Sequence, residues 1–121
     1  MARLLIVDDE ADVREFGANF FRKRKIEVTT AGSGEEALAL IEKQKPDLVL
    51  LDIKMNGIDG VETLKRIKNK NKGIKVVMVT GKDSDDDKSL EVCKGLGALD
   101  YIHKPLALDE LEETVLKVLL K

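Results

Sequence analysis

The chain has 121 residues, of which 43% are hydrophobic and 3% aromatic, and its formal net charge is −2. This length predicts one domain, large enough to bury roughly two-thirds of the surface that the unfolded chain exposes. The small net charge and the few aromatic rings argue against nucleic-acid binding. No apolar run reaches the length of a signal-peptide core or a membrane span, and the single cysteine permits no internal disulfide, so we expect a cytoplasmic protein.

The first strand-like and helix-like patterns lie at the amino terminus. Residues 4–7 form an apolar run that predicts a strand, and residues at about 11–24 have the periodicity of a helix. The helix ends in a basic run at 22–25, which suits the negative end of a helix dipole. We expect its buried side to carry three apolar residues: Val13, Phe16 and Phe20.

The next two units follow the same alternation. Residues 27–31 predict a second strand, after which Ser33 and Glu36 form a capping box for a helix that must end before Pro46. The third strand, residues 48–51, follows at once. A tight turn marked by Gly57 and Gly60 leads to a helix with apolar residues on one side: Val61, Leu64 and Ile67.

The last two units complete five repeats of strand and helix. The fourth strand is residues 76–79, and Ser84 or Asp85 can cap the helix that follows it. That helix carries Cys93 as a small buried hydrophobe and ends near Gly95 or Gly97. A short fifth strand at 101–103 precedes a last helix with four apolar residues at helical spacing: Leu108, Leu111, Val115 and Val118.

Five such units with short connections predict a doubly wound α/β fold, because right-handed crossovers place helices on both faces of a parallel sheet. The apolar runs 48–51 and 76–79 are typical of strands that are covered on both sides. No repeat or linker divides the chain, so residues 1–121 are expected to form one domain.

Polar groups follow four of the five predicted strands, at the point where each strand ends. They are Asp8, Asp9, Asp52, Thr80 and Lys104. The carboxyl ends of parallel strands meet at one edge of the sheet, where open α/β sheets bind ligands. Three crowded carboxylates need a cation such as Mg²⁺, which prefers oxygen ligands. A carboxylate can then carry a phosphoryl group whose oxygens the lysine and the hydroxyl bind, so the sequence predicts a phosphoryl-transfer site.

Four segments extend this pattern over nearly the whole chain. They are residues 5–10 (LIVDDE), 52–60 (DIKMNGIDG), 79–81 (VTG) and 97–105 (GALDYIHKP). In this order and spacing they resemble the response-regulator receiver domain, the phosphoacceptor module of two-component signalling. The resemblance implies a flavodoxin-like sheet of five parallel strands in the order 2-1-3-4-5 with five helices. One departure is Asn56, where many members have proline.

The resemblance also implies a role for each matching residue. Asp52 would be the phosphoacceptor, Thr80 the switch hydroxyl and Lys104 the phosphate-binding lysine. Tyr101 would be the switch aromatic, although half-buried packing on an edge strand is the alternative. The implied Mg²⁺ ligands are Asp8, Asp9, Asp52 and the main-chain carbonyl of Lys54.

Two further expectations complete the sites predicted from the sequence. Lys54 and Lys82 flank the predicted path of water to the phosphoryl group and would tune dephosphorylation, unless both lysines point into solvent. The peptide bond between Lys104 and Pro105 is a cis candidate.

The implied partners are a histidine kinase or histidine phosphotransfer protein, and a downstream protein that contacts the face of the fourth helix, fifth strand and fifth helix. With no further domain after Lys121, we expect a protein contact as the output, and no nucleic-acid or membrane partner. The chain would be a signalling domain that catalyses only its own phosphoryl transfer and dephosphorylation.

Two other classes of protein are weaker alternatives. A haloacid-dehalogenase-type phosphatase needs a second aspartate two residues after the first, where this chain has Lys54. A flavodoxin-like electron carrier needs a phosphate loop rich in Ser, Thr and Gly after the first strand, where this chain has three acidic residues at 8–10.

Overall fold

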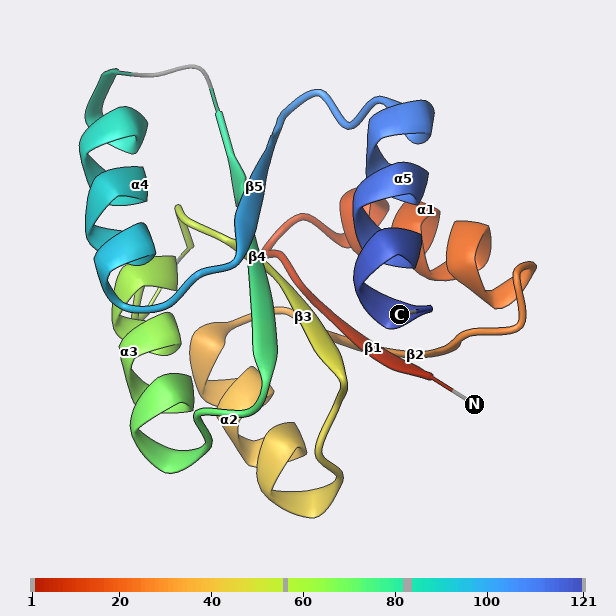
Figure 1. Cartoon of the computed structure of the whole chain (residues 1–121), viewed down its shortest axis with the longest axis horizontal. Coiled ribbons are helices and arrows are strands. Elements are labelled where there is room, and N and C mark those ends of the chain that lie inside the picture. Colours follow the sequence, from red (N-terminus) through yellow and green to blue (C-terminus); the bar gives the residue numbers. More distant parts are fainter. Residues whose placement is uncertain (1, 56, 82–83, 121) are drawn as a thin grey trace.

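The computed structural model describes residues 2–55, 57–81 and 84–120, and only the backbone of 84–87. In this part of the chain five strands alternate with five helices (Figure 1). The elements are β1 (Arg3–Val7), α1 (Ala11–Arg22), β2 (Glu27–Ala31), α2 (Gly34–Lys43), β3 (Leu48–Asp52), α3 (Gly60–Lys70), β4 (Lys75–Thr80), α4 (Ser84–Gly95), β5 (Asp100–His103) and α5 (Leu108–Leu119). All neighbouring strands are parallel, and their order β2-β1-β3-β4-β5 confirms the predicted sheet.

Helices cover both faces of the sheet, with α1 and α5 on one side and α2, α3 and α4 on the other (Figure 1). Successive side chains of a strand point to opposite faces. In β1, Leu4 and Ile6 therefore join the core under α1 and α5, whereas Leu5 and Val7 join the other core. This arrangement explains the continuous apolar runs of the central strands.

One expectation about α1 is wrong: Phe16 is not buried but 44% exposed. Val13 and Phe20 are only partly buried, and the helix presents Gly17, Ala18 and Phe21 to the sheet. The helix is thus rotated about its axis relative to the predicted orientation. Gly17 explains this rotation, because a Cβ at that position would lie 2.9 Å from the Cδ1 atom of Ile6. The helix thus approaches the sheet through its small residues, which leaves Phe16 on the outside.

The start of α2 follows its sequence signal, whereas α4 begins at Ser84, so Ser84 and Asp85 lie within that helix and not before it. The Ser33 side chain accepts a hydrogen bond from the Glu36 amide at 3.1 Å, and the Glu36 carboxylate accepts one from the Gly32 amide at 2.6 Å. In α4, Cys93 is fully buried as expected. None of the helices in the described ranges has the length and apolar character needed to span a membrane.

Candidate functional site

A pocket of about 300 Å³ opens at the carboxyl edge of the sheet, where the polar strand-end residues meet. It is lined by Asp9, Glu10, Asp52, Ile53, Lys54, Gly81 and Lys104. Asp8 and Asp52 are 2% and 5% exposed, so two carboxylates are buried at this edge. The fold thus brings together groups that lie almost one hundred residues apart in the chain.

Lys104 links three of these carboxylates. Its Nζ atom lies 3.0 Å from Asp8 Oδ2, 3.2 Å from Asp52 Oδ2 and 3.2 Å from Glu10 Oε1. The ammonium group partly offsets the repulsion between the two buried carboxylates. A positive charge between Asp8 and Asp52 also shows that this position suits a cation.

Burial changes the acidity of both partners in the Asp52–Lys104 pair. Burial and the negative charge of Asp8 raise the pKa of Asp52 from its ordinary 3.8 to about 6, although Lys104 opposes this shift. Burial disfavours the charge on Lys104, but its hydrogen bond to Asp8 and the charge of Asp52 outweigh that effect and raise its pKa. Lys104 therefore stays cationic at neutral pH. Asp52 binds a proton more tightly than an aspartate with the ordinary pKa does.

The segment between β1 and α1 holds the acidic cluster in place. The Asp8 amide donates to the Ala31 carbonyl at 3.1 Å, which extends the pairing of β1 with β2. Asp8 Oδ1 accepts from the Glu10 amide at 2.9 Å, and the Asp8 carbonyl accepts from Arg14 Nη1 at 2.7 Å. Main-chain and side-chain bonds thus fix the direction in which Asp8 faces the site.

The turn after Asp52 depends on two glycines. Gly57 has φ of +79°, a conformation that favours glycine. A Cβ on Gly60 would lie 2.2 Å from the main-chain oxygen of Asp52, and the Gly60 amide donates to the Ile53 carbonyl at 2.8 Å. The start of α3 therefore packs directly against the backbone that carries Asp52.

Thr80 ends β4 next to Gly81 in the pocket lining, and Tyr101 lies on the neighbouring strand β5. Thr80 is 1% exposed and its hydroxyl donates to the Gly81 carbonyl at 3.2 Å. The Lys104 amide donates to the Thr80 carbonyl at 2.7 Å, which ties the two site residues together. Tyr101 is 36% exposed, so its ring lies at the surface. The Lys104–Pro105 peptide bond is cis.

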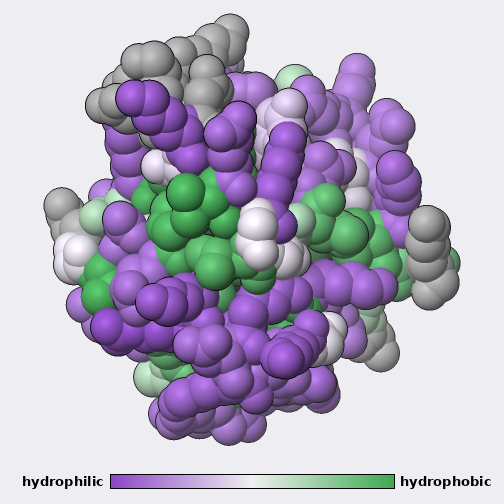
Figure 2. All heavy atoms as spheres, turned by 60° about the vertical axis from the view of Figure 1, so that its left-hand side comes forward, coloured by the Kyte–Doolittle hydropathy of each residue, from purple (hydrophilic) through white to green (hydrophobic). Residues whose placement is uncertain are grey.

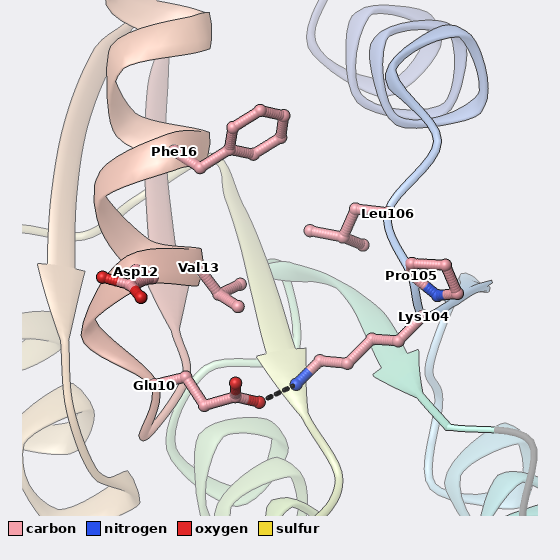
Figure 3. A pocket seen from close by; sticks show the side chains of 7 residues that line it. All are labelled: Glu10, Asp12, Val13, Phe16, Lys104, Pro105 and Leu106. Carbon is pink, nitrogen blue, oxygen red and sulfur yellow. Dashed lines mark hydrogen bonds and ion pairs between the residues drawn. The ribbon is translucent and has the colours of Figure 1, made fainter.

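An apolar groove of about 390 Å³ runs beside the polar pocket, between α1 and the segment that leads to α5. Val13 and Phe16 of α1 face Pro105 and Leu106 across it, and the Glu10–Lys104 ion pair lies at its end (Figure 3). Because this ion pair belongs to both cavities, the groove is continuous with the polar site.

The predicted site residues fall into three groups by their place in the structure. Asp8, Asp9, Asp52, Lys54 and Lys104 lie at the pocket, with Thr80 buried behind it. Tyr101 is at the surface, and Lys82 lies outside the described residues. Two residues at these cavities were not predicted as site residues: Phe16 was expected in the core, and Glu10, which directly follows the two aspartates, could have been included on that ground.

Comparison with known proteins identifies the class. The profile of the response regulator receiver domain matches residues 4–116. Sporulation initiation phosphotransferase F of Bacillus subtilis is 38% identical over 117 residues, which cover 97% of this chain and 93% of that protein. The transcriptional regulatory protein PhoP of the same organism, named for alkaline phosphatase synthesis, is 35% identical over 97% of this chain, which spans only 48% of that protein.

Solved structures agree with this result. The receiver domain of NtrX from Brucella abortus has a TM-score of 0.90 at 33% identity over 98% of both chains. The chemotaxis protein CheY4 of Vibrio cholerae has a TM-score of 0.89 at 30% identity, over 98% of this chain and 99% of that one.

The chain therefore belongs to the receiver domain family, the phosphorylation switches of two-component signalling. It is a signalling module of the kind found in phosphorelays rather than a classical enzyme. The phosphatase and electron-carrier alternatives are set aside by this assignment.

Proposed function

We propose that Asp52 accepts a phosphoryl group from a phosphohistidine on a histidine kinase or phosphotransfer protein. The observation that carries this proposal is the buried Asp52 carboxylate, 3.2 Å from the Lys104 ammonium in a pocket open at the carboxyl edge of the sheet. A carboxylate oxygen of Asp52 attacks the phosphorus, the P–N bond to the imidazole breaks, and the imidazole leaves. Lys104 and Thr80 bind the phosphoryl oxygens, which carry the charge in the transition state.

The residues present fit a divalent cation. One carboxylate oxygen each of Asp8, Asp9 and Glu10 lie within 4.8 Å of one another, and Lys104 already places a positive charge between Asp8 and Asp52. We assign Mg²⁺ to Asp8, Asp9, Asp52 and the main-chain carbonyl of Lys54, since Mg²⁺ takes a few carboxylates and keeps several waters. When bound, Mg²⁺ would offset the charge of these carboxylates and of the incoming phosphoryl group.

The groove beside the site suits the phosphodonor. A partner that presents a phosphohistidine to Asp52 must cover the surface around the pocket, and the groove supplies apolar contacts at that place. Phe16 is the large exposed apolar residue in its lining. We propose that a helix of the kinase or phosphotransfer protein packs against Phe16 while its histidine faces Asp52, and that this exchange takes place in the cytoplasm.

The output surface is proposed on the face of α4, β5 and α5. Apolar side chains gather near the centre of the side that carries α3 and α4 (Figure 2). On α4 and the segment after it, Val92 and Leu99 are 52% and 55% exposed, and Tyr101 is exposed on β5. A downstream protein whose binding depends on the position of the Tyr101 ring would bind here.

Intact mass after incubation with Mg²⁺ and a small phosphodonor tests the proposed function. Wild type should gain one phosphoryl group, whereas Asp52→Asn should gain none. The control Asp109→Asn removes an exposed carboxylate of α5 and should react like wild type. EDTA should abolish uptake in wild type. Equal uptake by wild type and Asp52→Asn would exclude Asp52, and uptake that survives EDTA would exclude the Mg²⁺ role.

The lifetime of the phosphorylated state is assigned to Lys54 and Lys82. Lys54 is exposed and lines the pocket beside Asp52, where a long cationic side chain can hinder the attacking water and pair with phosphoryl oxygens. We expect Lys54→Asn and Lys82→Glu each to shorten the half-life of phospho-Asp52 in a decay measurement at fixed Mg²⁺. Unchanged decay constants in both variants would mean that the two lysines only face solvent.

A further inference from the structure

Two side chains contact the exposed Tyr101 ring. The Nζ atom of Lys94, in the last turn of α4, lies 5.2 Å from the centre of the ring, a distance at which a cation is attracted to its π face. His103 meets the same ring edge-on, with centroids 5.2 Å apart and planes at 89°. The exposed position of Tyr101 therefore has a specific partner on the neighbouring helix.

The sheet places Tyr101 on the same face as Thr80. Tyr101 pairs with Met78, and His103 pairs with Thr80, so these four side chains share one face. Met78 belongs to the core on the α4 side, which fixes that face as the one toward α4. A shift of the Tyr101 ring toward Thr80 would take it along this face, away from Lys94.

From this arrangement we propose that Lys94 is a positioning residue that holds Tyr101 outward and so opposes the phosphorylated state. The inference rests on the proposed function, in which Tyr101 moves inward when Asp52 is phosphorylated. Because the contact with Lys94 exists only in the outward arrangement, it lowers the fraction of molecules that are ready for phosphorylation. Removal of the Lys94 charge raises that fraction.

The size of the effect follows from the strength of an exposed cation–π contact. Such a contact changes a two-state equilibrium by about two- to five-fold. The apparent affinity of a ligand scales with the fraction of competent protein. Beryllofluoride, a phosphate mimic, should then bind Lys94→Met about two- to five-fold more tightly than wild type in the presence of Mg²⁺.

A second role for Lys94 has to be separated from this one. A lysine in the last turn of a helix also interacts with the helix dipole, which would stabilise α4 without any effect on Tyr101. A double-mutant cycle distinguishes the two roles, because an effect that acts through the ring disappears in a Tyr101→Leu background. Lys94→Arg keeps the cation and should behave like wild type.

The composition of the chain provides a direct probe. Tyr101 is the single tyrosine and there is no tryptophan, so tyrosine fluorescence and fluorotyrosine NMR report on this ring alone. The experiment measures beryllofluoride affinity and quenching of Tyr101 fluorescence by acrylamide in wild type, Lys94→Met and Lys94→Arg, with Lys88→Met as a control for loss of an exposed lysine from α4. We expect tighter binding and a better protected ring in Lys94→Met alone, and no effect of the same change in Tyr101→Leu.

Two results would overturn the inference. If wild type binds beryllofluoride and Lys94→Met binds it equally well, Lys94 has no part in the switch, although the proposed function stands. If the gain in affinity persists in Tyr101→Leu, Lys94 acts through α4 and not through the ring. Failure of wild type to bind beryllofluoride would instead defeat the proposed function, and the role of Lys94 would fall with it.

Discussion

The buried Asp52 carboxylate lowers the stability of the folded protein when it is ionised. The pKa of its carboxyl is raised to about 6, mainly by burial and then by the charge of Asp8. A folded state that binds a proton more tightly than the unfolded state loses stability as pH rises between the two pKa values. The loss begins near the ordinary value of 3.8 and is complete above about 6. Its size is at most about 3 kcal/mol.

Replacement of Asp52 should therefore stabilise the unphosphorylated protein at neutral pH. We expect Asp52→Asn to raise the free energy of unfolding by about 1–3 kcal/mol at pH 7.5 in the absence of Mg²⁺. The gain should shrink as the pH falls through 6 toward 4, because wild-type Asp52 then becomes neutral itself. Urea unfolding of both proteins across this range measures the difference. A gain that is constant with pH would contradict a raised pKa at Asp52.

At the level of single residues, the sequence located the strand-end groups but not their contacts. Asp8 and Asp52 could be predicted to meet because each directly follows an apolar strand of a parallel sheet. The Glu10–Lys104 pair and the hydrogen bond from Thr80 to the Gly81 carbonyl depend on side-chain torsions that no periodicity encodes. The contact between Lys94 and Tyr101 likewise requires the position of α4 against β5.

At the scale of elements, the turn between β3 and α3 is set by a close approach of two backbones. A Cβ at Gly60 would lie 2.2 Å from the Asp52 carbonyl oxygen. We expect Gly60→Ala to cost more than about 2 kcal/mol of stability, since backbone has to move to admit the methyl group. Phosphorylation of Asp52 should slow as the loop shifts.

Gly95 offers a matched control for that substitution. It ends α4, and a Cβ there would meet nothing within 4 Å. Gly95→Ala should be neutral or stabilise the protein by up to about 1 kcal/mol, because alanine favours helix. Thermal unfolding and phosphorylation rates of the two variants test the pair. Equal stability of Gly60→Ala and wild type would show that the loop adapts to a methyl group without cost.

The rotation of α1 shows that helical periodicity alone does not predict which side of a helix is buried. The chain places apolar residues at 13, 16, 20 and 21, which allows more than one buried side. The structure selects the side with Gly17, Ala18 and Phe21, because small residues bring the helix close to the sheet. Periodicity counts apolar residues but does not measure how closely two elements can approach.

This rotation leads to a prediction about the phosphodonor. Phe16→Ala should leave stability nearly unchanged, whereas Phe21→Ala, at a fully buried position, should cost about 3–5 kcal/mol. Transfer to Asp52 from a phosphorylated histidine phosphotransfer domain should slow at least several-fold in Phe16→Ala, but uptake from a small phosphodonor should not. Val92→Ala, an exposed apolar residue of α4, serves as the control. An equal loss of rate with both phosphodonors would show that Phe16 contributes to phosphoryl transfer itself and not to docking of the partner.

For the whole molecule, the doubly wound sheet connects the proposed phosphorylation site with the proposed output face. Asp52 ends β3 and Thr80 ends the neighbouring strand β4. The next strand, β5, contains Tyr101 and is directly followed by Lys104. The overall fold was predictable because five alternating units with right-handed crossovers permit few arrangements. The strand order came from the family resemblance and is confirmed. Adjacent strands thus carry a chain of contacts from the pocket to the surface.

Phosphorylation should therefore alter the protein well beyond the pocket. On binding of Mg²⁺ and beryllofluoride, we expect the Thr80 hydroxyl to leave the Gly81 carbonyl for a charge-assisted hydrogen bond to the phosphate mimic. The Tyr101 ring can then move inward, provided that the two arrangements differ by only about a few kcal/mol. Amide chemical shifts should change at Thr80 and Tyr101 and along α4 and α5. The shifts of α2, which packs on β1 and β2 at the opposite edge of the sheet from β5, should stay largely unchanged. Thr80→Ala should keep the shifts near Asp52 and lose those at Tyr101. Changes confined to the lining of the pocket in wild type would show that the site binds the ligand without switching the surface.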